Sequence, residues 1–148
     1  LVLSTDRIRK KLFNVAVDEV LPADTYTKAS SDLVYRTQRE LSTRILQTGH
    51  SAIADGVFAK DWERKAITQC AQTAQTAFKG IWLESPSQEL MERVANRKND
   101  PSDATVEVVK KQLQIDQGPI TWQRLNSNQQ PENLTHQARS VIKGLWPW

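Results

Sequence analysis

Short apolar segments alternate with amphipathic segments along the whole chain, and this alternation constrains the fold more than any other feature. The segments at 1–5, 51–58, 78–84 and 120–125 have the composition of buried strands. Between them, apolar residues recur at helical spacing. Strands separated by helices imply parallel pairing through right-handed crossovers, with helices on both faces of one sheet. The sequence therefore predicts an α/β fold.

Helix starts are expected in every interval between these strands. They are placed directly after residue 5, near Ser30 and Ser31, at Asp61 as N-cap, at a capping box in residues 85–88, at Ser102 or Asp103, and at Pro131. Gly49 follows the last periodic residue of the second helix and is expected to end it. In such sheets ligands bind beyond the carboxyl ends of the strands, so candidate functional residues are sought there.

Composition and charge exclude a disordered or membrane-spanning protein and argue against, without excluding, a nucleic-acid partner. With 148 residues, 39% hydrophobic and 25% charged, the chain has the make-up of one globular domain. It lacks the run of about 18–20 apolar residues that a membrane-spanning helix requires. The net charge of +3 is spread along the chain, whereas a dedicated nucleic-acid binder shows a basic stripe. A single cysteine cannot form an internal disulfide, which favours a reducing, cytoplasmic setting. The sequence begins without Met and in what resembles the middle of a strand, so we expect it to be a fragment.

Asp6 and Arg9 form a D-x-x-R pattern where the first strand gives way to a helix. A carboxylate in this position can take the proton of an attacking hydroxyl, and an arginine one turn later can hold an acceptor or a phosphoryl oxygen. Asp is also a preferred N-cap residue, so the alternative is that Asp6 caps the helix while Arg9 is solvated. Position alone leaves both interpretations open.

Arg93 and Arg97 are four residues apart and are expected on one helical face. Paired guanidiniums suit the spread charge of a transferring phosphoryl group. The alternative is a solvated basic face, because cations are favoured near a helix C-terminus. Asp55 ends the second strand and has three candidate roles: binding an acceptor, binding magnesium through water, or capping a turn.

None of the five glycines belongs to a G-x-x-x-x-G-K-[ST] pattern. Residues 1–148 therefore contain no loop to cradle ATP phosphates, and they lack the lysine and the magnesium-binding hydroxyl of such a loop. His50 and His136 have no partner that suggests a metal or a nucleophile, so no metal site is predicted. Cys70 lies on an apolar helical stripe and is expected to pack as a small hydrophobe.

Five segments occur together in a characteristic order. They are S-T-D-R-I-R-K-K-L-F at 4–13, G-H-S-A-I-A-D-G-V-F at 49–58, G-I-W-L-E-S-P at 80–86, R-V-A-N-R-K-N-D-P-S-D-A at 93–104 and G-P-I-T-W-Q-R-L at 118–125. In this order they resemble bacterial P-loop kinases of the zeta-toxin, gluconate-kinase and polynucleotide-kinase type. The likeness is greatest to the ATP-binding, AAA-type domain that follows an aminoglycoside-phosphotransferase-like domain in two-domain bacterial proteins.

The resemblance implies a three-layer α/β/α P-loop kinase-like parallel sheet, truncated before its second strand. Residues 1–148 would form a single domain that is incomplete at its N-terminus, and residues 93–104 would form its lid. The central strand and the phosphate loop would then precede Leu1. Residues 1–5 and 51–58 would make one half-sheet, and residues 78–84 and 121–126 the other. The inner edges would be left unpaired, closed by pairing of the second strand with the fourth, or filled by a neighbouring subunit.

The same resemblance assigns expected roles to residues. Asp6 would be the general base and Arg9 would orient an acceptor or phosphate. Arg93 and Arg97 would close over the nucleotide phosphates, and the loop that starts at Asn126 would border the adenine. ATP and Mg²⁺ are the cofactors implied for the intact protein, with a fused aminoglycoside-phosphotransferase-like domain as a possible partner.

Three functions are therefore carried forward. The first is ATP-dependent phosphoryl transfer to a hydroxyl of a small molecule or nucleotide. The intact protein would carry out this reaction, whereas this chain alone would be inactive. The second is a nucleotide-sensing module that regulates a fused phosphotransferase domain. The third is a polynucleotide 5′-end kinase, favoured slightly by the sequence pI of about 9.1. No membrane partner is expected.

Overall fold

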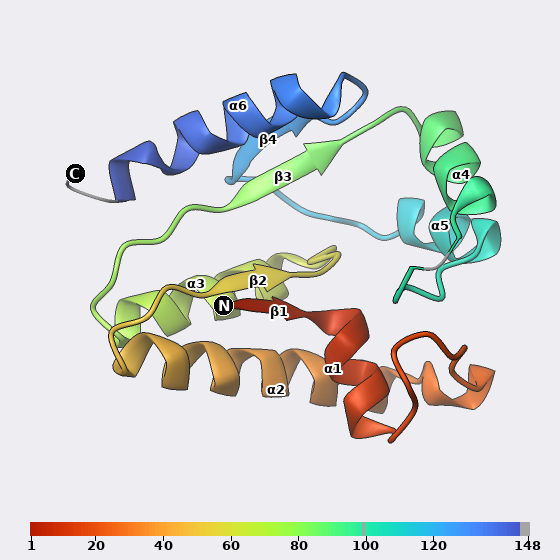
Figure 1. The fold of residues 1–148 in the computed structure, drawn as a ribbon, viewed down its shortest axis with the longest axis horizontal. Helices are drawn as coiled ribbons and strands as arrows, with labels where there is room; N and C mark the ends of the chain where they lie inside the picture. The colour runs from red at the N-terminus through yellow and green to blue at the C-terminus, as the bar shows by residue number, and fades with distance from the viewer. Residues whose placement is uncertain (99, 146–148) are drawn as a thin grey trace.

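Four short strands form two separate parallel pairs in the computed structural model, which describes residues 1–98 and 100–145 (Figure 1). β1 (Val2–Ser4) pairs with β2 (Ile53–Asp55), and β3 (Ile81–Glu84) pairs with β4 (Gln123–Asn126). These are the two half-sheets that the resemblance to P-loop kinases implies, and the α/β class with parallel pairing is confirmed. The single sheet that the alternating pattern predicts is not formed among the described residues.

β2 and β3 are the inner strands of the two pairs, and Figure 1 shows β2 on the side of β1 that faces β3. In the described part of the chain each of these inner strands pairs only with its own partner. Their inner edges therefore keep backbone groups without a strand partner, the first of the three outcomes considered above. Figure 1 also shows the carboxyl ends of the strands pointing toward the side where α4 and α5 lie.

Six α-helices and two short 3-10 helices connect and flank the strands in the described residues. They are α1 (Thr5–Leu12), η1 (Ala23–Thr25), α2 (Lys28–Gln47), α3 (Asp61–Thr73), α4 (Ser87–Asn96), α5 (Val106–Leu113), α6 (Pro131–Ile142) and η2 (Lys143–Leu145). α2 packs against both α1 and α3 below the β1–β2 pair, while α6 lies along β4 (Figure 1). α4 and α5 pack on one another at the carboxyl edge. No described helix is both long and apolar enough to cross a membrane.

One face of the β1–β2 pair is covered and the other is bare. On the covered side, Gln38 of α2 donates from Nε2 to the backbone oxygens of Leu3 (2.7 Å) and Asp55 (2.9 Å), which ties the two strands together. On the bare side the register partners Val2 and Ile53 are 66% and 60% exposed. Parallel strands are normally buried on both faces, so this face has the composition of a core without the layer that would cover it.

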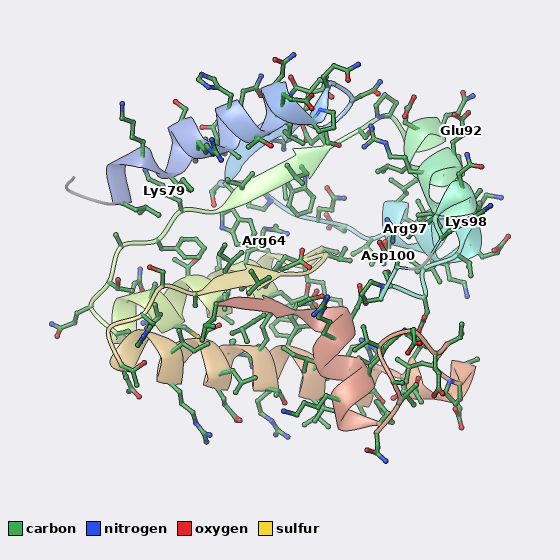
Figure 2. All side chains as sticks on the ribbon, viewed as in Figure 1. Arg64, Lys79, Glu92, Arg97, Lys98 and Asp100 are labelled. Atoms are coloured by element: carbon green, nitrogen blue, oxygen red, sulfur yellow. The ribbon has the colours of Figure 1, made fainter. Side chains whose placement is uncertain are left out.

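The two halves of the molecule meet through Arg64 and a group of aromatic rings. Arg64 of α3 is 3% exposed and lies between β2 and β3 in the view of Figure 2. Its guanidinium donates to the backbone oxygens of Phe58 and Ala59 on one side and of Gln117 and Pro119 on the other.

Trp122 extends this junction. Its ring packs edge-on against Phe58, with centroids 5.4 Å apart, and also contacts Phe78 at 5.8 Å. Phe58 has a positive φ of 46° and its N–H donates to the hydroxyl of Tyr35 (3.0 Å), so the turn after β2 is held from both sides. A Cβ at Gly80 would lie only 2.3 Å from the Trp122 ring, which explains why glycine occupies this position.

Several element boundaries differ from the sequence-based expectation. β2 and β3 are shorter than the apolar segments that contain them, since only central or carboxyl-terminal residues of those segments pair. β4 begins three residues later than the segment at 120–125 and ends one residue beyond it. α2 begins at Lys28 rather than near Ser30, because the Thr27 hydroxyl accepts from the N–H of Ser30 (3.1 Å) and caps the helix earlier. α6 begins at Pro131 as expected, and Gly49 (φ 78°) follows α2 as expected.

The predicted caps of α3 and α4 are wrong. Lys60 is the N-cap of α3, and its N–H donates to the Glu63 carboxylate (3.1 Å), which places Asp61 inside the helix. The capping box at 85–88 does not form, because α4 starts one residue later than expected and Pro86, its N-cap, has no side-chain acceptor.

The predicted cap of α5 is also wrong. Thr105 caps this helix by accepting from the N–H of Val108 (3.4 Å). Ser102 and Asp103, the expected caps, lie further from the helix, and the Asp103 carboxylate is engaged by Lys10 instead. A long-range ion pair has therefore displaced the local capping interaction.

Candidate functional site

The carboxyl ends of β1 and β2 bring Asp6 and Asp55 to one edge of the structure. Asp55 is the register partner of Ser4, and Asp6 follows two residues later in the first turn of α1. The two carboxyl groups are close enough to interact electrostatically. Parallel topology alone accounts for this placement, since neighbouring strands end at the same edge.

Asp6 lies in an environment that suits a proton acceptor. Burial raises the pKa of the Asp6 carboxyl above its usual value, the Ser102 hydroxyl partly reverses this effect, and the charge of Asp55 raises the pKa again. Ser4 is the N-cap of α1, so the alternative in which Asp6 caps the helix is wrong. A carboxyl whose pKa is raised toward neutral pH is a stronger base than an ordinary one.

Arg9 is placed one turn beyond Asp6 but is buried, at 8% exposure. Its guanidinium donates to the backbone oxygen of Thr25 (3.4 Å) and to Ser31 Oγ (3.3 Å), and it lies 4.9 Å from the centre of the Tyr26 ring. The alternative in which Arg9 is solvated is therefore wrong. In this arrangement Arg9 organises the segment between α1 and α2, next to the Asp6 side chain.

Arg93 and Arg97 do not share one helical face. Arg93 lies in the last turn of α4, where it pairs with Glu89 (3.5 Å) and donates to the backbone oxygen of Ser127 (3.0 Å). α4 ends at Asn96, so Arg97 follows in extended conformation and pairs with Asp100 (3.7 Å). The prediction of a single basic helical face is wrong because α4 ends at Asn96, one residue before Arg97.

Asn126 ends β4 and begins the loop that Arg93 contacts. Its side-chain oxygen accepts from the N–H of Asn128 (2.8 Å), and Ser127 Oγ donates to the backbone oxygen of Glu84 (2.9 Å). The loop is thus joined to both α4 and β3. Any ligand that borders Asn126 would therefore lie near Arg93.

The described residues between α4 and α5, 97–98 and 100–105, are here called the strap and connect these parts. Within the strap, Asp100 pairs with Arg97 and accepts from the N–H of Ser102 (2.8 Å). Ser102 in turn faces Asp6 across the carboxyl edge. Figure 2 shows Arg97 and Asp100 on the side of the molecule where α1 begins. The structure therefore brings Arg97 to the same region as Asp6, through two intervening residues, whereas Arg93 faces the loop after β4.

Two further cations, Lys10 and Arg64, are buried, and the sequence did not indicate this. Lys10 is 1% exposed and pairs with Asp103. Both cations lie on amphipathic helices, where a charged side chain is normally expected to be exposed to solvent. No spacing rule would have identified them.

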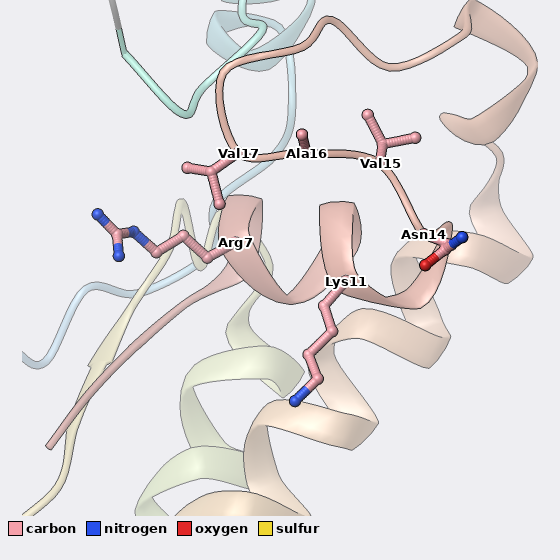
Figure 3. A pocket seen from close by; sticks show the side chains of 6 residues that line it. All are labelled: Arg7, Lys11, Asn14, Val15, Ala16 and Val17. Atoms are coloured by element: carbon pink, nitrogen blue, oxygen red, sulfur yellow. The ribbon is translucent and has the colours of Figure 1, made fainter.

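Two open depressions occur among the described residues, and neither contains the candidate residues. The first, about 530 Å³, is lined by Arg7, Lys11, Asn14, Val15, Ala16 and Val17. Figure 3 shows that Arg7 and Lys11 extend in different directions from α1, so their charges do not converge on one ligand. The second, about 380 Å³, lies on α6 beside His136 and Arg139.

Comparison with known proteins identifies the family. The chain matches the family model described as an AAA domain over residues 1–119, most of its length. The chain belongs to this AAA-domain family. Membership supports a nucleotide-binding, P-loop kinase-like character, in agreement with the parallel α/β arrangement and with the resemblance seen in the sequence.

Three mycobacterial relatives share this region. The uncharacterized proteins Rv2004c and MT2060 of Mycobacterium tuberculosis and Mb2027c of Mycobacterium bovis are each 27% identical over 111 residues. The matched region is 72% of this chain but 22% of each relative. The AAA-domain chain thus corresponds to a minor part of these longer proteins.

Proposed function

We propose that this AAA-domain chain carries the acceptor side and the lid of an ATP-dependent kinase, which transfers the γ-phosphoryl group to a hydroxyl of a small molecule or nucleotide. The observation that carries the proposal is the placement of Asp6. It lies at the carboxyl edge of a parallel pair, with a raised pKa, beside the strap that holds Arg97. Substrates of open α/β folds bind at this edge.

Asp6 would act as the general base in this reaction. The acceptor hydroxyl oxygen forms a bond to the γ-phosphorus, the bond from that phosphorus to the leaving ADP oxygen breaks, and the hydroxyl proton moves to Asp6. Arg97 and Arg93 would supply positive charge to the phosphoryl oxygens. Asp55 and Arg9 border the acceptor position, where Asp55 is exposed and available and Arg9 holds the neighbouring segment in place.

We propose that the phosphate loop follows a further strand, outside the sequence of this chain, which lies between β2 and β3. Two observations support this position. The inner edges of these strands have no strand partner among the described residues, and Ile53 and Leu83 beside them are 60% and 57% exposed. An added parallel strand would pair with both edges and cover apolar side chains that are otherwise in water.

Asp6 and Asp55 are the candidate residues of this chain that would help to hold magnesium. Among residues 1–98 and 100–145, no three His, Cys, Asp or Glu side chains are grouped so as to hold a metal ion. Mg²⁺ is commonly held by one or two carboxylates together with substrate phosphates and water, so Asp6 and Asp55 would fit as part of such a site. The hydroxyl ligand of a phosphate loop is not in this sequence. The steps assigned to this chain are therefore limited to proton transfer, charge stabilisation and positioning.

The test is the Asp6→Asn variant of the full-length protein that contains this chain, with Asp32→Asn as matched control because Asp32 is exposed on α2. Phosphoryl transfer is measured by ADP release with candidate acceptors, and nucleotide binding by calorimetry. The proposal expects a loss of transfer of about 10²-fold or more in Asp6→Asn with nucleotide binding retained, and no change in Asp32→Asn.

Two results would point to another function. If Asp6→Asn binds nucleotide and alters no transfer activity, the chain is a nucleotide-sensing module for a fused phosphotransferase domain. If transfer requires an oligonucleotide and its binding weakens steeply with salt, the protein is a polynucleotide 5′-end kinase.

A further inference from the structure

Lys10 and Asp103 form a buried ion pair between two distant parts of the chain. Lys10 Nζ lies 3.1 Å from Asp103 Oδ1, and the two side chains are 2% and 7% exposed. The ammonium group also donates to the backbone oxygens of Val17 (2.9 Å) and Glu19 (2.7 Å). All three N–H bonds of Lys10 therefore have an acceptor, so burial of its charge is fully compensated.

Asp103 uses its second oxygen for the segment between α1 and α2. Asp103 Oδ2 accepts from the N–H of Leu21 (3.1 Å) and from the hydroxyl of Tyr26 (2.9 Å). One carboxylate thus joins the strap to α1, through Lys10, and to residues 13–27. The Tyr26 ring in turn stacks on Arg9, so the network continues along the face of α1 that carries Asp6.

The remaining hydrogen bonds described for the strap stay largely within it. Asp100 binds Arg97 and Ser102, and Ser102 Oγ accepts from the N–H of Ala104 (3.4 Å). α4 and α5, which the strap connects, pack on one another at the carboxyl edge (Figure 1). Attachment of the strap to α1 is therefore concentrated on Asp103, with Ser102 beside Asp6 as a second, smaller contact.

We propose that the Lys10–Asp103 pair is a latch that fixes the strap over the start of α1. Release of the latch frees the strap and uncovers Asp6, while the β1–β2 and β3–β4 halves keep their structure. This movement does not depend on whether the protein transfers phosphoryl groups. Its physical basis is that a buried pair of this kind is strongly weakened when either partner is removed, because the other charge is left without compensation.

Limited trypsin digestion tests the latch, because the strap contains its own cleavage sites. Arg97 and Lys98 are exposed, and Lys79, also exposed, lies far along the chain between α3 and β3 as an internal reference (Figure 2). The full-length protein is compared with Asp103→Asn, Lys10→Met and the double variant. Glu84→Gln is the matched control, since it weakens the half-exposed pair with Arg124.

We expect each single variant to speed cleavage after Arg97 and Lys98 by about tenfold or more, because cleavage follows the population of the released strap. The double variant should be cleaved no faster than the singles, since both remove one interaction. Cleavage after Lys79 should stay within about twofold in every variant, and Glu84→Gln should leave all the rates unchanged.

Three results would overturn the latch. Unchanged cleavage after Arg97 and Lys98 in the single variants would mean that other contacts hold the strap. An equal acceleration at Lys79 would mean that the variants unfold the whole protein. A double variant whose acceleration equals the product of the two single effects would mean that Lys10 and Asp103 act independently.

Discussion

Replacement of Arg64 by methionine should destabilise the protein more than any exposed substitution, because Arg64 joins its two halves. The guanidinium donates to Phe58 (2.7 Å) and Ala59 (2.9 Å) on one side and to Gln117 and Pro119 on the other. A hydrogen bond from a charged donor contributes about 1.5–3 kcal/mol, and an unpaired buried carbonyl adds a further penalty. These terms overlap, so we expect the free energy of unfolding to fall by about 4 kcal/mol.

Arg64→Lys separates charge from geometry. Lysine keeps the positive charge but cannot span both groups of carbonyls, so we expect about half the loss of the methionine variant. Lys65→Met is the control, because Lys65 is the next residue of α3 and its side chain is 75% exposed. Its effect should stay below about 0.5 kcal/mol.

Urea denaturation followed by tryptophan fluorescence measures these differences. Trp82 is a suitable reporter, since the Arg64 guanidinium lies 5.4 Å from the centre of its ring. A loss below about 1 kcal/mol in Arg64→Met would refute the argument, because it would mean that the four carbonyls find other partners at little cost. Equal losses in Arg64→Met and Arg64→Lys would show that the fork geometry contributes nothing.

Two further predictions concern packing and pH. Gly80→Ala places a Cβ 2.3 Å from the Trp122 ring, so we expect the free energy of unfolding, measured by thermal denaturation, to fall by about 1–3 kcal/mol. Gly144→Ala is the control, because its Cβ meets nothing within 4 Å and should change the stability little. Equal effects of the two variants would contradict the packing argument. Burial alone would raise the pKa of Asp103, but hydrogen bonds from Leu21, Tyr26 and Lys10 outweigh this and hold its pKa below the usual range. The ionised Asp103 carboxylate therefore contributes its full stabilisation above its unfolded pKa of about 4, and this stabilisation is lost as the pH falls through the lower folded pKa. Between pH 5 and pH 2, the free energy of unfolding, measured by urea denaturation, should fall more for the wild type than for Asp103→Asn. An equal fall in both proteins would contradict this prediction.

The parallel arrangement could be predicted from the sequence because it depends on patterns that act locally. Apolar segments of strand length separated by helices leave few topologies other than parallel pairing. Which strands pair with which was implied by the family resemblance and not by the local pattern. The position of Asp6 and Asp55 at one edge follows from that topology. Proline at the start of α6 and glycine after α2 also act through the local backbone, and both are found where expected.

Features that depend on distant contacts could not be predicted. Asp103 reads as a helix cap because capping needs only neighbouring residues, yet it binds Lys10, 93 positions earlier in the chain. The end of α4 at Asn96 separates Arg97 from the helical face of Arg93, and nothing in the spacing of the two arginines indicates this. Burial of Lys10 and Arg64 likewise depends on backbone oxygens supplied by other loops.

The division of the sheet has a consequence for cooperativity. Each half has its own hydrogen-bond ladder and its own flanking helices, so amide protection should fall into two groups of residues that open with different free energies. A ligand or polypeptide bound across both halves would make them open together as one folding unit. Amides far from the binding surface would then gain protection from exchange, and this gain would measure how much of the protein is bound.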